Sequence, residues 1–480
     1  MTTESPEQER TAGPARATAD GAPGADAGRT ATVRRDGPGP RTAVAFEFVR
    51  ALVALALVPF HLAVHLVRAG ARTREVARDL GSSAEPTEVP EVEAPRSPHV
   101  FVSCAEPSGE IHATNLVRAL SRLTEGRATF SGLGSEALEG LGVARVGDPV
   151  SKARMGFGVV AALPFYLRLL TDVARELRET RPDVCVMVDS PALHVPIGRI
   201  ARRYGVPVVH FVTPQYWGWA PWRVGGYRRA VDLALTILPF EVPWFASRRV
   251  PCAHVGHPIV DRLATIAARD EPRDDGPIAV LPGSRASVVG RNLPFMLEVL
   301  RGMDGEKALV PVGRPDLAEL VRAEVEAAGM TDRVDVAVGD LHEVLPRCRA
   351  ALSVSGTVLL DLLHHRLPCA VVYRLSNALE PALAPHLLTV PHFASINLLA
   401  ARAVVPEFCF AGDGPVEEVR SALAALARRG PERERCIAGL AEARLALGGP
   451  GAVERAARWT LAAASGRPLP IRVKTATASA

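Results

Sequence analysis

The sequence contains no close pair of cysteines. Its seven cysteines are scattered through 480 residues, and no two of them have a CxxC spacing. An odd and scattered set argues against a disulfide framework and against a thiolate metal site, so we expect buried free thiols in a reducing compartment. Aromatic residues are also few, at 5% of the chain, and the hydrophobic 48% is mainly alanine, valine and leucine. This composition is typical of a globular α/β protein.

The sequence has no large charge excess. It carries 56 basic and 52 acidic residues, which leaves a net charge of +4, and the two signs are interspersed along most of the chain. That pattern excludes a nucleic-acid partner as the main function. No cluster of His, Cys and carboxylate residues indicates a metal site, and we expect no metal and no other cofactor. No signal-peptide pattern begins at Met1.

The first 97 residues show little sign of a folded domain, apart from one apolar run. Residues 1–41 are rich in Ala, Gly, Pro, Thr and Arg without apolar periodicity, so we expect a disordered tail. Residues 71–97 are charged and rich in proline, which predicts a linker. Between them, residues 42–70 predict an apolar helix that associates with a membrane.

The apolar run itself covers residues 51–67, between Arg50 and Arg68. At ~1.5 Å per residue it is slightly short of a ~30 Å hydrocarbon core. One proline and two histidines within it weaken the interpretation as a span. A helix on the membrane surface, a single span and a helix docked on the protein remain three alternatives, and arginines on both flanks leave the orientation open.

From residue 98 the sequence alternates between apolar strands and helices. Residues 98–270 form one such series and residues 271–466 a second, after a charged hinge, and a tail follows at 467–480. Alternation of this kind predicts parallel sheets whose ligands bind at the carboxyl ends of the strands. The fold class that we predict is therefore α/β, with two Rossmann-like domains facing a cleft.

Two turns in the second series suit a phosphate. The strand at residues 278–281 ends in Pro-Gly-Ser-Arg, which places Gly283, Ser284 and Arg285 before a helix. Free N–H groups at such a turn attract an anion, and an arginine can grip a phosphate with two hydrogen bonds. A second strand leads into Ser355-Gly356-Thr357, with Asp361 one helical turn later. Either turn alone would be an ordinary βα loop, but two turns and a carboxylate indicate a nucleotide.

In the first series, the strand at residues 184–188 ends in Asp189-Ser-Pro191. At the carboxyl end of a strand, Asp189 is the best candidate for a catalytic base, with a helix N-cap as the rival interpretation. A polar turn at residues 104–112 and a loop at residues 213–223 that holds three of the five tryptophans lie in the same series.

The chain from about residue 98 to 450 resembles the lipid-A-disaccharide synthases, which are glycosyltransferases with the two-domain GT-B fold. Many blocks match the family's motifs in sequence order. They are Ala105-Glu-Pro-Ser-Gly-Glu110, the apolar helix around Met155-Gly156, Val188-Asp-Ser-Pro191, residues 213–223, Leu238-Pro-Phe-Glu241, Val255-Gly-His-Pro258, Leu281 to Arg285, Ser355-Gly-Thr357, Tyr373-Arg374, and Asn397-Leu-Leu-Ala400 with Arg402.

The resemblance implies a hexosyltransferase. Such an enzyme transfers a 2,3-diacylglucosamine unit from its UDP donor onto 2,3-diacylglucosamine 1-phosphate and releases UDP. The partners would be a UDP-sugar and a lipid acceptor at a membrane surface, with a homodimer formed through the carboxyl-terminal part. The location would be the cytoplasmic face of the inner membrane, held peripherally or by residues 42–70.

The resemblance also distributes roles over the site residues. Asp189 would be the base and Arg285 would bind the leaving diphosphate. The residues that would contact substrate are Glu106, Ser108, Gly109, His112, Trp217, Arg223, His257, Gly283, Ser284, Ser355, Gly356, Thr357, Asp361 (in place of a glutamate for the ribose), Asn397 and Arg402.

Several motif positions depart from the family pattern. The departures are Ala105, Glu110, Ala220, Val288, Asp361 and the Ala401-Arg402-Ala403 segment. The residues expected at the donor diphosphate are better retained than the polar residues around them. Two alternatives therefore stay open: a related transferase with another lipid acceptor, and a UDP-sugar-binding scaffold without turnover. A sugar-nucleotide epimerase shares the fold, but the 238–241, 255–258 and 397–400 blocks argue against it.

Overall fold

The computed structural model describes residues 37–82, 85–91, 95–154, 159–268, 273–375 and 388–466. The expected amino-terminal tail as far as residue 36, the hinge residues 269–272 and the tail at 467–480 lie outside these ranges. So does the Met155-Gly156 motif. All seven cysteines are described and are free thiols, and all but the half-buried Cys409 are buried, which confirms that prediction.

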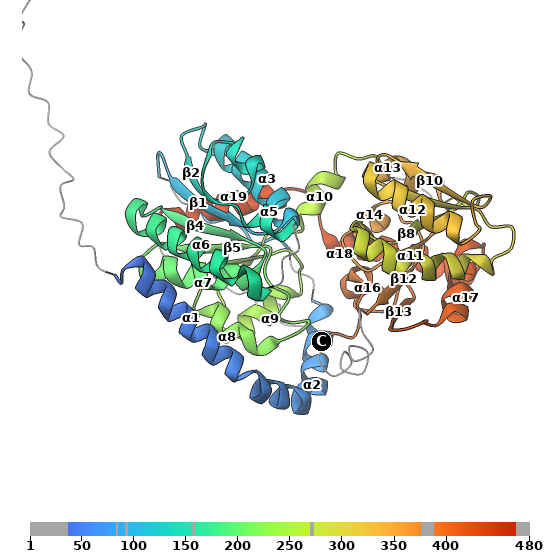
Figure 1. Cartoon of the computed structure of the whole chain (residues 1–480), viewed down its shortest axis with the longest axis horizontal. Helices are drawn as coiled ribbons and strands as arrows, with labels where there is room; N and C mark the ends of the chain where they lie inside the picture. The colour runs from blue at the N-terminus through green and yellow to red at the C-terminus, as the bar shows by residue number, and fades with distance from the viewer. Residues whose placement is uncertain are drawn as a thin grey trace, which may run out of the picture. The chain divides into compact units, whose positions relative to one another are not determined.

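Within the described ranges, the first series forms a seven-stranded parallel sheet in the order β3-β2-β1-β4-β5-β6-β7 (Figure 1). Its central strands are apolar and buried, as expected for a parallel sheet that is covered on both faces. The strands are β1 (His99–Cys104), β2 (Thr129–Leu133), β3 (Val143–Gly147), β4 (Val184–Val188), β5 (Val208–Phe211), β6 (Leu233–Thr236) and β7 (Cys252–His254). The helices are α3 (Pro107–Leu123), α4 (Glu136–Glu139), α5 (Pro149–Arg154), α6 (Val159–Thr180), α7 (Pro191–Arg203), α8 (Val224–Arg228), α9 (Glu241–Ser247) and α10 (Pro258–Leu263), with a short 3₁₀ turn at Pro221–Arg223.

The second series forms a parallel sheet of six described strands in the order β10-β9-β8-β11-β12-β13. The strands are β8 (Ile278–Leu281), β9 (Ala308–Val312), β10 (Val334–Val338), β11 (Ala350–Val354), β12 (Cys369–Arg374) and β13 (Glu407–Phe410). The helices are α11 (Ala286–Arg301), α12 (Pro315–Ala327), α13 (Leu341–Val344), α14 (Val358–His364), α16 (Ser395–Ala400), α17 (Val416–Ala427) and α18 (Pro431–Leu447), with a 3₁₀ turn at Leu345–Arg347.

The two sheets have the same kind of switch point. In the first sheet the chain moves outward from β1 to β3 on one side and from β4 to β7 on the other. In the second sheet the corresponding neighbours are β8 and β11. At such a point the loops after the two neighbouring strands diverge to opposite faces of the sheet, which opens a crevice for a ligand. The α/β prediction with two Rossmann-like sheets is therefore confirmed.

The last described helix, α19 (Ala452–Ala464), does not pack with the second sheet. It contacts α3, β4 and β5 of the first sheet. The carboxylate of Asp261 on α10 accepts hydrogen bonds from the backbone N–H groups of Gly451, Ala452 and Val453, which caps the free N–H groups at the start of α19. The segment 271–466, expected to pack as one domain, thus sends its last helix back to the first sheet.

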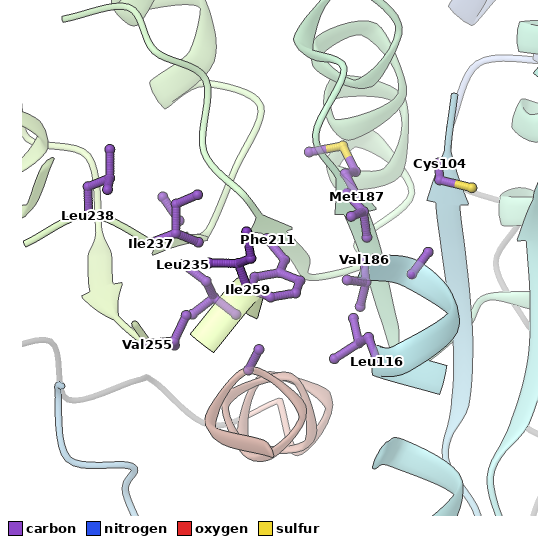
Figure 2. Close-up of a cluster of buried hydrophobic side chains, with 14 of the residues drawn as sticks. Cys104, Leu116, Val186, Met187, Phe211, Leu235, Ile237, Leu238, Val255 and Ile259 are labelled. Carbon is purple, nitrogen blue, oxygen red and sulfur yellow. The ribbon is translucent and has the colours of Figure 1, made fainter. Parts of the chain in front are cut away.

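Figure 2 shows part of the core that results around the first sheet. Leu116 of α3 lies beside Val186 of β4, and Phe211 of β5 lies near Leu235 of β6 and Ile259 of α10. Most of these side chains are fully buried, and burial of each large apolar side chain stabilises the fold by ~1.5–3 kcal/mol. This core fixes the carboxyl ends of β1, β4 and β5, where the expected site residues begin.

The amino-terminal apolar segment forms two helices, α1 (Pro40–Ala56) and α2 (Val58–Leu80). The prediction of a linker from residue 71 was therefore wrong for residues 71–80, because α2 continues through them and buries Val76 and Leu80. Among the described residues, no single helix is long and apolar enough to cross a membrane. Taken together, α1 and α2 meet that length and composition, but they are bent by 50°.

Candidate active site

The first switch point brings the polar turn after β1 next to Asp189. Cys104 and Val188 are partners in the parallel register, so the chain leaves both strands at the same edge of the sheet. Gly109, in the first turn of α3, packs on this spot. A Cβ at Gly109 would lie 3.2 Å from the carbonyl oxygen of Val188 and 3.5 Å from the Cβ of Asp189. Glycine leaves room for this approach, because a Cβ would require the backbone of Val188 to shift by a few tenths of an ångström.

The turn itself is shorter than expected, because α3 begins at Pro107. Ser108, Gly109 and His112 are thus helical. Glu106 and Ser108 are exposed and available to a ligand, whereas Glu110 is buried and accepts a hydrogen bond from the backbone N–H of Ser135 at 2.7 Å. Glu110 therefore ties α3 to the loop after β2.

The backbone at Asp189 is strained. Asp189 and Ser190 have φ values of 58° and 45°, two consecutive non-glycine residues in the left-handed region, each of which costs about 1–3 kcal/mol. Two buried histidines hold this conformation. The Nδ1–H of His194 and the Nε2–H of His210 both donate to the carbonyl oxygen of Asp189, at 2.5 Å and 2.9 Å. The half-buried Asp189 side chain is thereby directed by a fixed backbone.

The hydrogen bonds also define the tautomer of His194. Because a carbonyl oxygen only accepts, Nδ1 carries the proton, and Nε2 is left to accept from the hydroxyl of Ser103 at 2.9 Å. Burial lowers the pKa of His194 to about 4 and that of His210 to about 3, so both rings are neutral at pH 7. These two histidines are held as neutral hydrogen-bond donors.

We predict that His194→Leu lowers kcat by about tenfold or more, because Asp189 loses one of the two donors that hold its backbone. His194→Asn, which places an amide N–H near the Nδ1 position, should recover most of that loss. Both variants are to be compared by kcat and by thermal unfolding. A Leu variant that unfolds earlier yet keeps the wild-type kcat would show that the histidine supports only the fold.

His112 lies close enough to Asp189 to feel its charge, and His257 lies close to His112. Burial lowers the pKa of His112, and the negative charge of Asp189 opposes that shift. Burial lowers the pKa of His257 to about 3, with His112 and His254 adding to the effect. The Nδ1 of His257 accepts from the backbone N–H of Ile259 and caps α10, so its Nε2–H is left as a donor. These two expected contacts thus belong to the first switch point.

In the tryptophan loop, residues 213–223, the tryptophan that was expected to contact the substrate is buried. Trp217 is buried, donates its indole N–H to Glu241 at 3.1 Å and stands edge-on to Phe240 with ring centres 4.8 Å apart. It supports the loop from beneath. The exposed tryptophan is Trp219, 50% exposed, with the exposed guanidinium of Arg223 5.5 Å from its ring centre. Trp219, which the sequence analysis did not single out, is therefore the tryptophan of this loop that a ligand could reach.

The second switch point brings the two anion-binding turns together. Leu281 of β8 and Ser353 of β11 are partners in register, so the Pro-Gly-Ser-Arg turn and the Ser-Gly-Thr turn leave the sheet side by side. Gly283 has a φ of 124°, and a Cβ there would lie 2.5 Å from the Val288 side chain. Only glycine suits this turn.

The groups exposed at the second switch point are hydrogen-bond donors and a guanidinium, which are groups that bind a phosphate. Ser284 and Arg285 are exposed, with Arg285 in extended conformation at the start of α11, and Gly356 and Thr357 are exposed beside them. Among the described residues no ion pair involves Arg285. Ser355 instead donates its hydroxyl to the carbonyl of Phe393 at 3.2 Å, which fixes the second turn to the loop before α16.

That loop is fixed by a carboxylate that the sequence analysis missed. Glu407 of β13 accepts from the backbone N–H groups of Phe393 and Ala394, at 2.9 Å and 2.7 Å, and from Nδ1 of His392 at 2.9 Å. Glu407 comes 13 to 15 residues after its partners, so no local pattern connects them. It supports the second turn from behind through Phe393.

Three further expected substrate contacts have partners within the protein. Asp361 is buried and bonded to Arg262 at 2.5 Å, and burial raises its pKa while Arg262 opposes the shift. Asn397 is fully buried, and its amide bonds the backbone of residues 404–405. Arg402 is exposed and pairs with Glu442. For these three, a role at the substrate stays a prediction.

Two parallel α/β sheets, each with its own switch point, are the architecture of the GT-B fold. One solved structure with this fold, the S. aureus MnaA–UDP co-structure, superposes with a TM-score of 0.50 at 14% identity and covers 74% of this chain and 94% of that one. A likeness at this identity shows the fold alone.

Residues 100–429 match the model of the family described as lipid-A-disaccharide synthetase, and the chain belongs to that family. The lipid-A-disaccharide synthase of Myxococcus xanthus is 33% identical over 376 residues, which cover 76% of this chain and 97% of the relative. The synthase of Azotobacter vinelandii is 34% identical over 355 residues, 70% of this chain and 92% of the relative. Helices α1 and α2 precede the matched residues.

Proposed function

We propose that this chain is a hexosyltransferase that moves a 2,3-diacylglucosamine unit from UDP-2,3-diacylglucosamine onto 2,3-diacylglucosamine 1-phosphate. The product is the lipid A disaccharide, and UDP leaves. One observation carries the assignment beyond family membership. In each of the two sheets, the motifs follow neighbouring strands, β1 and β4 in the first sheet and β8 and β11 in the second. They therefore lie at the carboxyl edge of that sheet, where proteins of this fold class bind their ligands.

The first switch point suits the acceptor. An acceptor hydroxyl attacks C1 of the donor sugar, and the C1–O bond to the diphosphate breaks as the new glycosidic bond forms. The hydroxyl proton needs a base, and Asp189 is the carboxylate that the fold holds there, with its backbone fixed by His194 and His210. We expect the Nε2–H of His257 and the hydroxyl of the exposed Ser108 to orient the acceptor.

The second switch point suits the leaving group. Charge develops on the β-phosphate of UDP as the bond to C1 breaks, and fixed N–H groups and a guanidinium stabilise it. The exposed Arg285 and the Gly356–Thr357 backbone are the groups available at that edge. Because both substrates carry acyl chains, the reaction takes place at a membrane surface, which we place at the cytoplasmic face of the inner membrane.

A UDP-release assay tests the proposal. Purified protein with UDP-2,3-diacylglucosamine should release UDP only when 2,3-diacylglucosamine 1-phosphate is added in mixed micelles. Release without acceptor would indicate hydrolysis of the donor. Binding of UDP without release under any of these conditions would discard the transferase and favour a binding protein.

We predict that Arg285→Ala lowers kcat/KM for the UDP-sugar by about 10- to 100-fold, because a hydrogen-bonded charge on the leaving diphosphate contributes ~1.5–3 kcal/mol. Arg285→Lys should recover only part of this, since lysine cannot form the two parallel bonds of a guanidinium. Arg301→Ala is the matched control, because Arg301 lies at the other end of α11 and pairs with Glu298. Equal kcat/KM values for the Arg285 and Arg301 variants would contradict the diphosphate role.

A further inference from the structure

The bend between α1 and α2 exposes a continuous apolar segment. All ten residues from 51 to 60, Ala-Leu-Val-Ala-Leu-Ala-Leu-Val-Pro-Phe, are exposed. Leu55 and Phe60 expose 68% and 64% of their surface, and Val67, farther along α2, exposes 88%. We call residues 51–60 the elbow. Exposed apolar surface of this extent in a folded protein marks a site of association.

The elbow is apolar on every side of the helix. The buried residues of α1 are Ala43, Val44 and Glu47, near its start, whereas every residue from 51 to 60 is exposed, whichever side of the helix it lies on. A second protein would cover one side of such a helix and leave the other in water. A helix that is apolar all round suits a hydrocarbon environment, which surrounds it completely.

Helices α1 and α2 together, residues 40–80, form an arm whose two ends are fixed to the protein. Near the start of α1, the buried carboxylate of Glu47 pairs with Arg199 and Arg203 of α7, at 2.7 Å and 3.1 Å. Toward the end of α2, Glu75 pairs with Arg248 at 2.9 Å. Figure 1 draws this arm in blue, and α1 contacts α6 and α7 while α2 contacts α9. The chain thus leaves the protein at one point and returns to it at another.

The charge on the arm is of one sign where it meets solvent. Its exposed charged residues are all arginines, at positions 41, 50, 68, 74 and 78. Its acidic residues are either buried or half-buried beside a cation. Arg50 directly precedes the elbow, and Arg68 ends the apolar run that continues from the elbow into α2. A basic rim around an apolar tip complements a leaflet of anionic lipids, where each arginine near the surface adds attraction.

We infer that the elbow enters one leaflet of an anionic bilayer and holds the enzyme as a monotopic protein. Because both ends of the arm return to the same folded body, they lie on the same side of the membrane, and the arm does not span it. The elbow consists of six residues at the end of α1 and three at the start of α2, on either side of Leu57, so neither part extends more than ~9 Å into a ~30 Å hydrocarbon core. Of the three alternatives that the sequence left open, this inference chooses the helix on the membrane surface over the single span and the helix docked on the protein. It rests on the proposed function only in that acylated substrates are met at the same surface.

Helix α2, just after the elbow, contacts the tryptophan loop at residues 213–223. His61 of α2 stacks on Trp222 with ring centres 6.2 Å apart, and His65 meets the same ring edge-on at 5.1 Å. Trp222 follows Trp219, the exposed tryptophan of the first sheet's site. The elbow therefore holds the membrane at a defined position relative to the loop that faces the acceptor.

Flotation with vesicles of three parts phosphatidylethanolamine to one part phosphatidylglycerol tests the inference on the full chain. Wild-type protein should float with the vesicles, and Leu55→Glu/Phe60→Glu should reduce the bound fraction by at least about tenfold. The matched control, Val338→Glu/Leu445→Glu, makes the same change at exposed positions 49% and 82% accessible on the second sheet's side and should float normally. Equal flotation of the elbow variant and wild type overturns the inference.

Two further measurements separate the alternatives. A membrane-impermeant maleimide added outside the vesicles should label both Ala45→Cys and Gly70→Cys, whereas a span would protect one of them.

Light scattering should give the same mass for wild type and elbow variant, whereas a change from dimer to monomer would assign the elbow to a second copy and overturn the inference. UDP release in detergent micelles should be unchanged in the elbow variant. An inactive wild type that still floats would contradict the proposed function alone.

Discussion

Replacement of Asp189 by asparagine is expected to lower kcat by about 10²–10⁴-fold, the usual contribution of a positioned general base. Asparagine preserves the size of the side chain and tolerates the left-handed conformation at φ 58°, so the fold should stay intact. The expected loss is in kcat, with KM for the UDP-sugar little changed, because Asp189 lies at the first sheet's switch point and the donor's diphosphate at the second. Initial-rate kinetics with both substrates varied will separate the effect on kcat from the effect on KM.

The control for this variant is a carboxylate that the same sheet uses for structure. Asp183→Asn lies just before β4, where the carboxylate accepts from the backbone N–H of His99 at 2.8 Å at the opposite end of the strand. It should cost a little stability and leave kcat unchanged. If Asp189→Asn keeps more than about a tenth of the wild-type kcat, Asp189 acts as a helix-starting residue before α7, and the base must be sought elsewhere.

The largest effect on stability is expected at Glu241. Its carboxylate is fully buried and accepts from the backbone N–H groups of Ile237 and Leu238, both at 3.0 Å, and from the indole N–H of Trp217. Glu241→Ala leaves three buried donors without an acceptor. At ~1–3 kcal/mol each, the free energy of unfolding should fall by about 3 kcal/mol or more. Glu241→Gln keeps one acceptor oxygen and should lose less. Denaturant unfolding of the three proteins gives this order directly.

Glu241 also predicts how stability depends on pH. Burial raises its pKa from the ordinary 4.5 to about 7, against the hydrogen bonds from Leu238, Trp217 and Ile237, which lower it. In the unfolded chain the group ionises near pH 4.5, so the folded state binds the extra proton between 4.5 and 7. Stability from this group is therefore present below pH 4.5 and lost as the pH rises toward 7. Glu241→Gln removes that dependence, and a wild-type curve with the same slope as the Gln variant would contradict it.

The sequence predicted the parts of the fold that local patterns determine. The alternation of apolar strands and helices predicted both sheets, and the Pro-Gly-Ser-Arg sequence predicted the glycine turn after β8. The same reasoning placed Asp189 and the Ser-Gly-Thr turn at strand ends. It worked because in a parallel sheet every strand carries its carboxyl end to the same edge, so sequence position after a strand predicts spatial position.

The sequence did not predict what depends on contacts between distant segments. Trp217 was expected at the substrate, but an acceptor 24 residues later draws its indole into the core. The support of Asp189 by His210 crosses from β4 to β5. The return of α19 to the first sheet depends on Asp261, which caps it from 190 residues away. Nor does any local pattern show that α2 continues to Leu80, because its last turns are charged, and helices that it contacts, such as α9 and α16, come from segments far along the chain.

The most direct test of the proposed reaction is mass spectrometry of its product. Wild-type protein is supplied with UDP-2,3-diacylglucosamine labelled with ¹³C in the glucosamine ring and with unlabelled 2,3-diacylglucosamine 1-phosphate. The account predicts a tetraacyl disaccharide 1-phosphate that carries one labelled and one unlabelled ring, formed in equal amount with UDP and absent with Asp189→Asn. Release of labelled free sugar without a disaccharide, or transfer of the labelled ring only to a different lipid, would contradict it.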